Sequence, residues 1–258
     1  LLAGLSLGRE GPSIQIGAMT GKAVSKILDR GKTEEKYLLT CGASAGLAAA
    51  FHAPLAGVMF SLEEIHKNFS VSVLVSVMTA SITADYVSSQ FLGFHSVFQF
   101  DIGAEIQPRY YWHILILGVI LGLLGAFYNK MTLWVQNLYY KAKGLNETSR
   151  LLIPFLLAGV LGLFVPQVLG SGHDLIETAA GGEMLLGTLL GFLVLKFVFS
   201  LISFGSGAPG GIFFPLLVLG ALIGGSYGTF AAQYMGLDPS YISNFGLLAM
   251  AGLFTAFV

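Results

Sequence analysis

Charged residues are scarce in this 258-residue chain, because Asp, Glu, Lys and Arg make up only 10% of it, against about a quarter in a soluble globular domain. Hydrophobic residues make up 55%, and the mean hydropathy is +0.77. This composition predicts a membrane protein. The formal net charge is -1, and no basic patch with interleaved aromatic residues occurs, so we expect a lipid bilayer rather than a nucleic acid as the partner.

Cysteine is almost absent, since Cys41 is the only one in the chain. A single cysteine excludes an internal disulfide and a Cys-rich metal site. The sequence also has no HExxH motif, so nothing supports a zinc protease. We therefore expect no metal, no cofactor and no enzymatic activity.

Long apolar runs predict an all-α, polytopic membrane helical bundle with no soluble domain. The longest run, 110–140, carries one formal charge, Lys130. At about 1.5 Å per residue it is long enough to cross a ~30 Å hydrocarbon core at a tilt. Similar runs cover 37–62, 71–94, 151–169, 184–204, 211–235 and 244–258. Because a full span needs ~20 residues, we expect roughly eight to ten membrane-embedded helices.

The distribution of Lys and Arg predicts the orientation, because positively charged loops stay in the cytoplasm. These residues gather in 22–36 and 141–150, whereas 95–109 and 166–183 are mainly acidic. We expect the first two segments to face the cytoplasm and the other two the outside. A multi-pass protein of the plasma (cell inner) membrane is the expected location.

An internal repeat is visible as the spacing P-x4-G-A-x2-G, which occurs from Pro12 and again from Pro215. AGLAAAF at 45–51 and AGLFTAF at 251–257 form a second echo. The first proline helix leads into the basic loop and the second into an acidic one, which indicates an inverted-topology repeat. The alternative is that small residues four apart merely allow close helix packing.

Each proline helix follows glycine-rich backbone, GREG or GSGAPGG. We expect the helices to begin at the prolines, since proline suits the first helical position. Irregular backbone at membrane depth survives only where it lines a cavity or is buried in protein. Two opposed broken half-helices would aim N–H groups and the positive ends of their dipoles into that cavity, which predicts an anion site.

Glu10 lies at this predicted site, where a carboxylate is costly and therefore marks a function. When ionised it can compete with the anion, and when protonated it can leave the site. This interpretation makes Glu10 both a gate and a proton carrier. The alternative is a structural ion pair between Arg9 and Glu10.

The motifs GREGPSIQIGA, GASAGLAAAFHAPLAGVMFSLEE and GSGAPGGIFFP, in this order, resemble the CLC family of chloride channels and proton-coupled chloride exchangers. The resemblance implies two inverted halves, with 1–258 forming a single transmembrane domain. Residues 1–94 would be the end of the first half and 110–258 most of the second. It also implies a homodimer, with 54–64 and 71–88 as the contact.

The resemblance assigns residues to roles. Glu10 occupies the position of the family's gating glutamate. The backbone amides of Ile212 and Phe213 match those at the central anion, and those of Arg9, Gly11 and Phe214 match the outer position. Glu64 matches the glutamate that passes protons from the cytoplasm in exchangers, with Glu63 beside it; the alternative is that both are merely solvated helix-end charges.

The predicted function is therefore chloride/proton antiport, with chloride or another halide and protons as the bound ions. A passive chloride channel of the same family is the alternative. The family's anion-binding serine would precede Leu1 and its pore tyrosine would follow Val258, which leaves selectivity against nitrate or fluoride open. GSGHDLI at 170–176 is either the second-half echo of that serine motif or an ordinary loop.

Two other classes of function have weaker support. GASAG at 42–46 fits G-x-S-x-G, with Ser44 as the nucleophile and His52 or His66 as the base of an intramembrane serine hydrolase. That motif needs a strand before the serine, whereas this segment has a helical composition. A sodium-coupled transporter of organic solutes shares the inverted repeat, but no carboxylate-rich cation site lies beside either glycine loop.

Overall fold

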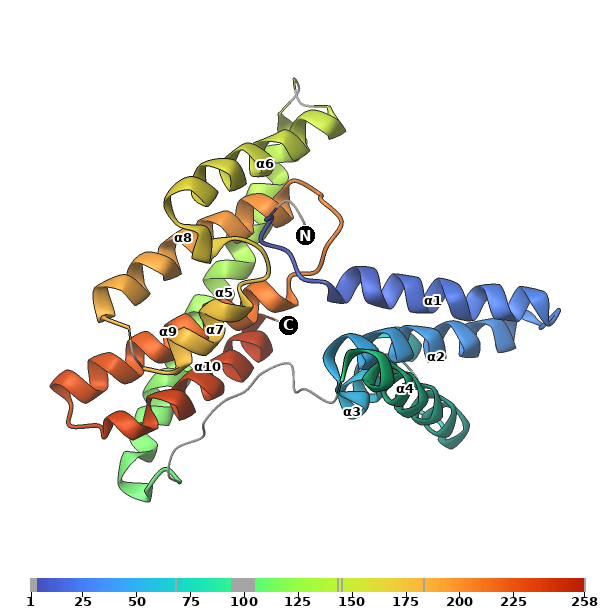
Figure 1. Ribbon diagram of the computed structural model, residues 1–258, viewed down its shortest axis with the longest axis horizontal. Coiled ribbons are helices and arrows are strands. Elements are labelled where there is room, and N and C mark those ends of the chain that lie inside the picture. The colour runs from blue at the N-terminus through green and yellow to red at the C-terminus, as the bar shows by residue number, and fades with distance from the viewer. Residues whose placement is uncertain are drawn as a thin grey trace. The chain divides into compact units, whose positions relative to one another are not determined.

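The computed structural model describes residues 4–67, 69–93, 105–142, 144, 146–182 and 184–257. Within these residues the chain forms ten α-helices and no strand, as the apolar runs predict (Figure 1). Two compact units are present, Arg9–Phe98 on the one hand and Leu1–Gly8 with Gln99–Val258 on the other. The predicted all-α fold is confirmed.

Five of the described helices are long and apolar enough to cross a membrane, judged by length and composition. They are α4, α5, α8, α9 and α10, and the α5 and α10 candidates include the 3-10 turns that precede them. The other described helices are shorter or more polar. The expected eight to ten membrane-embedded helices include helices that do not cross completely, and that number stays a prediction.

The smaller unit consists of the hairpin of α1 and α2, the short helix α3 with its π-helical continuation, and the long helix α4. Its elements are α1 (Glu10–Ile27), α2 (Lys32–Phe51), α3 (Pro54–Phe60), a π-helical segment (Ser61–His66) and α4 (Val71–Leu92). The apolar run 37–62 contains a break, because α2 ends at Phe51 and α3 begins at Pro54. His52 adopts the left-handed conformation (φ 50°) and ends α2, and a helix does not continue readily into a residue that precedes proline.

The larger unit is built around α9. Its elements are α5 (Tyr111–Lys141), α6 (Glu147–Phe164), α7 (His173–Ala180), α8 (Leu186–Gly205), α9 (Phe213–Tyr234) and α10 (Ile242–Phe257), with short 3-10 turns at Pro108–Tyr110, Pro166–Val168 and Pro239–Tyr241. Every residue of α9 from Phe214 to Thr229 is buried. A helix that is apolar on all sides and buried is the core of its bundle.

Glycines allow the first helix of each proposed repeat to lie directly against the helix that follows it. In the smaller unit, a Cβ on Gly17 would lie 2.1 Å from the carbonyl oxygen of Gly42 in α2. In the larger unit, a Cβ on Gly224 would lie 2.4 Å from the carbonyl oxygen of Phe245 in α10. Any side chain at these two positions would overlap the neighbouring carbonyl oxygen, so only glycine lets the two helix backbones approach this closely. The repeated P-x4-G-A-x2-G spacing therefore has the same packing role in both units.

Both proline helices begin earlier than predicted. The first residue of α1 is Glu10 and that of α9 is Phe213, so Pro12 and Pro215 each occupy the third helical position. The first four N–H groups of an α-helix have no carbonyl acceptor within the helix, so a proline at position three removes no intrahelical hydrogen bond. The correction moves Glu10 from the loop into the first turn of α1.

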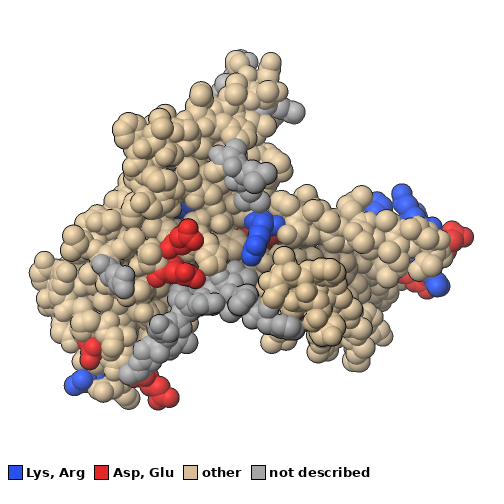
Figure 2. All heavy atoms as spheres, in the orientation of Figure 1, with Lys and Arg blue, Asp and Glu red and all other residues tan. Residues whose placement is uncertain are grey.

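Charged side chains gather where α1 turns into α2, at the end remote from Glu10 (Figure 2). Lys22 lies 3.9 Å from Glu35, and Arg30 lies 3.7 Å from Glu34. The basic cluster on which the orientation prediction rests thus sits on one turn of the hairpin. Most of the predicted outer segment 95–109, as well as Lys143 and Glu183, falls outside the described residues, so the sidedness stays a prediction.

Asp238 begins the turn that leads into α10. The backbone N–H of Ser240 donates to its carboxylate at 2.9 Å, and hydrogen bonding to Ser240, first from this backbone group, lowers the pKa of the Asp238 carboxyl. A short acidic side chain at this position satisfies an N–H that the following helical turns leave without an acceptor.

We expect Gly17→Ala to destabilise the protein, because the added methyl group would collide with the Gly42 carbonyl and force α1 away from α2. Overpacking of this kind costs about 1–3 kcal/mol. Thermal unfolding in detergent measures the effect. Gly118→Ala in α5 is the matched control, since its Cβ would meet nothing within 4 Å. Equal melting temperatures for the two variants would contradict the close packing of α1 on α2.

Candidate functional site

The first of the predicted anion-binding segments lies at the start of α1. Arg9 is the N-cap residue, Glu10 is the first residue of the helix, and Gly11 follows. The first intrahelical hydrogen bond runs from the Ser13 N–H to the Arg9 carbonyl at 3.0 Å. Glu10 is only 7% exposed, so a carboxyl group is buried in the turn where the helix dipole favours negative charge.

The second segment has the same construction at the start of α9. Ile212 is the N-cap residue, Phe213 begins the helix, and Phe214 is buried at position two. The Leu216 N–H donates to the Ile212 carbonyl at 3.0 Å, which corresponds to the Ser13 bond in α1. The two helix starts therefore match residue for residue, with Phe213 where α1 has Glu10.

The two glycine loops are joined directly by hydrogen bonds within the larger unit. The Gly8 N–H donates to the Gly211 carbonyl at 2.8 Å, and the Gly211 N–H donates to the Gly8 carbonyl at 3.0 Å. Helix α1 begins two residues after Gly8, and α9 begins two residues after Gly211. This pairing satisfies four backbone groups that irregular chain in a membrane cannot leave exposed to lipid.

The segment that carries Gly8 is embedded in an apolar core of the larger unit. Leu5 and Leu7 are buried with Val168 and Phe199. A Cβ on Gly210 would lie 2.7 Å from the Leu7 Cβ, so only glycine lets the loop before α9 approach this closely. The loop composition GSGAPGG thus reflects a steric requirement as well as flexibility.

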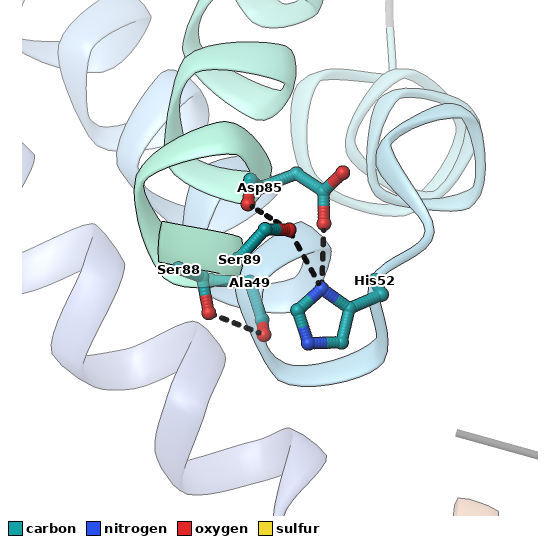
Figure 3. A network of polar contacts seen from close by, with 5 residues as sticks. All are labelled: Ala49, His52, Asp85, Ser88 and Ser89. Atoms are coloured by element: carbon teal, nitrogen blue, oxygen red, sulfur yellow. Dashed lines mark hydrogen bonds and ion pairs between the residues drawn. The ribbon is translucent and has the colours of Figure 1, made fainter. Parts of the chain in front are cut away.

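A polar network follows the end of α2 within the smaller unit (Figure 3). The Nδ1 atom of His52 lies 3.0 Å from the carboxylate of Asp85 and 3.4 Å from the hydroxyl of Ser89, both in α4. The Ser88 hydroxyl donates to the Ala49 carbonyl at 3.4 Å. Asp85 lies inside a candidate membrane span, where a carboxylate needs a partner. His52 supplies that partner and ties the break between α2 and α3 to α4.

Arg9 is linked to this network by its contact with Phe51, the residue before His52. Its guanidinium carbon is 5.9 Å from the centre of the Phe51 ring, which is the outer limit of a cation–π contact. Phe51 is the last residue of α2 and precedes His52. Arg9, which precedes the buried Glu10, therefore packs against the end of α2. The His52–Asp85 pair attaches this same end to α4.

Glu64 lies in the π-helical segment that continues α3. The segment Ser61–His66 ends where the Lys67 N–H donates to the Leu62 carbonyl at 3.1 Å. Glu63 and Glu64 are both exposed, and the His66 ring stacks on Tyr37 of α2 at 5.3 Å between centroids. Short π-helical turns are rare in proteins, and those that occur are often at functional sites.

The structure describes the Arg9–Gly11 and Ile212–Phe214 helix starts in separate units. That these residues surround one anion stays a prediction, as do the roles of Glu10 and Glu64. Sequence reasoning missed Asp85 as the partner of His52, and it missed Lys196, which is fully buried in α8. A signal for both existed in the sequence, because each is an ionisable residue within an apolar run.

The hydrolase alternative finds no structural support. Ser44 is buried in the middle of α2, a continuous helix, and its hydroxyl hydrogen-bonds to the Ser81 hydroxyl of α4. A nucleophile elbow places its serine on a sharp turn between a strand and a helix, and no strand occurs among the described residues. The small residues around Ser44 serve helix packing.

We expect His52 and Asp85 to be energetically coupled. A double-mutant cycle of His52→Ala and Asp85→Ala, followed by thermal unfolding in detergent at pH 7, should give a coupling energy of about 0.5–3 kcal/mol, because each single change leaves a polar partner in a half-buried site. Ser72→Ala in the same helix is an exposed polar control. Additive effects of the two substitutions would show that the contact contributes nothing to stability.

Comparison with known proteins gives a consistent result. The family model described as voltage gated chloride channel matches residues 1–258. Proteins named H(+)/Cl(-) exchange transporter ClcA from Cronobacter sakazakii and Salmonella newport are each 37% identical over 257 residues, covering 97% of this chain and 54% of the relative. The chain thus spans about half the length of the curated relatives it matches.

Solved structures show the same fold. A slow cyanobacterial Cl-/H+ antiporter superposes with a TM-score of 0.83 at 24% identity, covering 97% of this chain and 64% of that one. A CLC-type fluoride/proton antiporter superposes with a TM-score of 0.75 at 26% identity, covering 98% and 61%. Together with the helical architecture and the paired glycine loops, the family match establishes that this chain is a multi-pass membrane protein of the voltage-gated chloride channel (CLC) family.

Proposed function

We propose that this chain forms the anion-binding and proton-coupling part of a chloride/proton antiporter. The observation that carries the proposal is the burial of Glu10 as the first residue of α1, directly after a loop that is hydrogen-bonded to the loop before α9. A protonatable group at such a position can exchange places with an anion. The names of the ClcA relatives and of the cyanobacterial antiporter agree with this function.

The proposed anion site uses backbone groups rather than a basic side chain at the ion. The amides of Ile212 and Phe213 bind the central anion, and those of Arg9, Gly11 and Phe214 serve the outer position. Helix N-termini favour anions through their N–H groups and the helix dipole. An ion bound in this way leaves more readily than one in contact with a full Lys or Arg charge, which suits transport.

Protons take a separate route in this proposal. Glu64 accepts them from the cytoplasm, and Glu10 exchanges them at the anion site. The exposure of Glu64 at the end of the segment that begins at Pro54 supports its access to water. Because a passive channel needs no second carboxylate, the presence of Glu64 favours exchange.

The proposed assembly is a homodimer in the plasma membrane, with contacts from 54–64 and 71–88. One face of α4 supports an apolar contact, because exposed residues recur on it at helical spacing. These residues are Val71, Val75, Met78 and Ile82. Chloride is the proposed substrate, and the fluoride/proton antiporter among the structural neighbours makes fluoride the competing anion to compare.

Flux in proteoliposomes tests the proposal directly. A chloride gradient should drive protons uphill in the wild-type protein, with chloride and pH recorded together. Glu10→Gln and Glu64→Gln should abolish proton movement and leave chloride flux, because an amide cannot carry the proton. Glu63→Gln is the matched control and should change neither flux, since Glu63 is equally exposed in the same turn.

Two outcomes would contradict the proposal. Intact proton movement in Glu10→Gln would remove its role as proton carrier. Chloride flux without proton movement in the wild-type protein would identify a passive channel instead, and replacing chloride by fluoride in the same assay compares the two anions.

A further inference from the structure

Lys196 is a buried lysine that the proposed mechanism does not use. It lies within α8, a candidate membrane span, and its side chain is fully buried. A Lys side chain in the middle of a membrane-spanning helix is costly and is retained where it serves a function. Its position within the fold indicates which function.

The Lys196 ammonium group is held by backbone carbonyl groups. Its Nζ atom donates to the carbonyl oxygens of Val168 and Gly170, both at 2.9 Å. None of the ion pairs among the described residues includes Lys196. The Lys196 side chain is therefore oriented by neutral backbone dipoles and not by a described carboxylate.

The loop that receives Lys196 runs from Val168 to Gly172, so it includes the first three residues of GSGHDLI, whose last four begin α7. Gly172 has a positive φ of 81°, and a Cβ there would lie 3.1 Å from the Lys196 Nζ and 2.9 Å from a methyl group of Val218 in α9. The absence of a side chain at Gly172 thus leaves room for the ammonium group between the loop and α9.

This contact places the charge near the start of α9. Val218 lies five residues after Phe213, which corresponds to about 7.5 Å along the helix axis. The ammonium group is therefore on the order of 10 Å from the helix start, too far to touch an ion there and near enough to act on it through the low-dielectric interior.

The loop at Gly170 also binds residues 4–8, the segment that precedes Glu10 in the chain. The Gly170 N–H donates to the Gly4 carbonyl at 2.8 Å, while the Gly170 carbonyl accepts from Lys196. Residues 4–8 then run to the Gly8–Gly211 pair. Lys196 is thus connected to both glycine loops within the larger unit.

We propose that Lys196 is an affinity-determining residue for anion binding, whose buried charge raises the positive potential at the start of α9 without contacting the ion. This inference rests on the anion site of the proposed function. It accounts for a transporter site that holds an anion at useful affinity while keeping fully charged side chains out of contact with the ion.

Chloride titration calorimetry of the purified protein, in gluconate buffer of constant ionic strength, tests the inference. Lys196→Gln should weaken chloride binding on the order of tenfold, because one charge at ~10 Å is removed from a medium of low effective dielectric constant. Lys196→Arg keeps the charge and should stay within about threefold of wild type. Lys130→Gln is the matched control, since it removes an exposed lysine from α5 and should leave the affinity unchanged.

Wild-type affinity in Lys196→Gln would overturn the inference, and so would equal weakening in Lys196→Arg and Lys196→Gln, which would indicate a role of side-chain shape alone. Absence of chloride binding by the wild-type protein would instead refute the proposed function. Failure of the inference and failure of the function therefore give different results.

A second measurement needs no uncharged variant and covers the case in which Lys196→Gln does not fold. The measurement is NMR of protein labelled with 15N at the lysine side chains. The Lys196 ammonium resonance is assigned as the signal that is missing from the spectrum of Lys196→Arg. It should shift on addition of chloride and not of gluconate, while the Lys130 resonance stays constant. A Lys196 resonance insensitive to chloride would overturn the inference.

Discussion

Irregular backbone within a membrane must find its hydrogen bonds inside the protein, and in this chain the reciprocal pair between Gly8 and Gly211 meets that demand. Each loop satisfies the other, and each ends two residues later in a helix, α1 or α9. Gly210 is required beside this pair, because a Cβ there would lie 2.7 Å from the Leu7 Cβ. The positions at which the two helices begin therefore follow from one local backbone contact.

The other features of the larger unit support this contact. Leu5 and Leu7 anchor the segment before α1 in an apolar core, and the Gly170 N–H donates to the carbonyl of Gly4 at its beginning. Lys196 in turn organises the carbonyl groups of the 168–170 loop. Lys196, the 168–172 loop and the buried helix α9 are thus in mutual contact. The proposed anion binding depends on this arrangement.

Much of this architecture could be predicted from the sequence, and the failures have physical reasons. The helices over 71–94 and 110–140 are clear because long apolar runs have few other solutions in a membrane. The break after Phe51 lies between equally apolar residues, and the proline at 54 is what marks it in the sequence. Lys196 stands out in the sequence as an ionisable residue within an apolar run, but its contacts with two carbonyl groups of the 168–170 segment could not be predicted, because periodicity carries no information about them.

The central claim is that the starts of α1 and α9 form one anion site guarded by Glu10. Anomalous diffraction from crystals of the protein grown in bromide tests it most directly, because bromide replaces chloride and is located without ambiguity. The account predicts an anomalous peak within hydrogen-bonding distance of the backbone nitrogens of Ile212 and Phe213, with the Glu10 carboxyl beside it. Bromide bound elsewhere only, or a Glu10 carboxyl remote from residues 212–213, would contradict it.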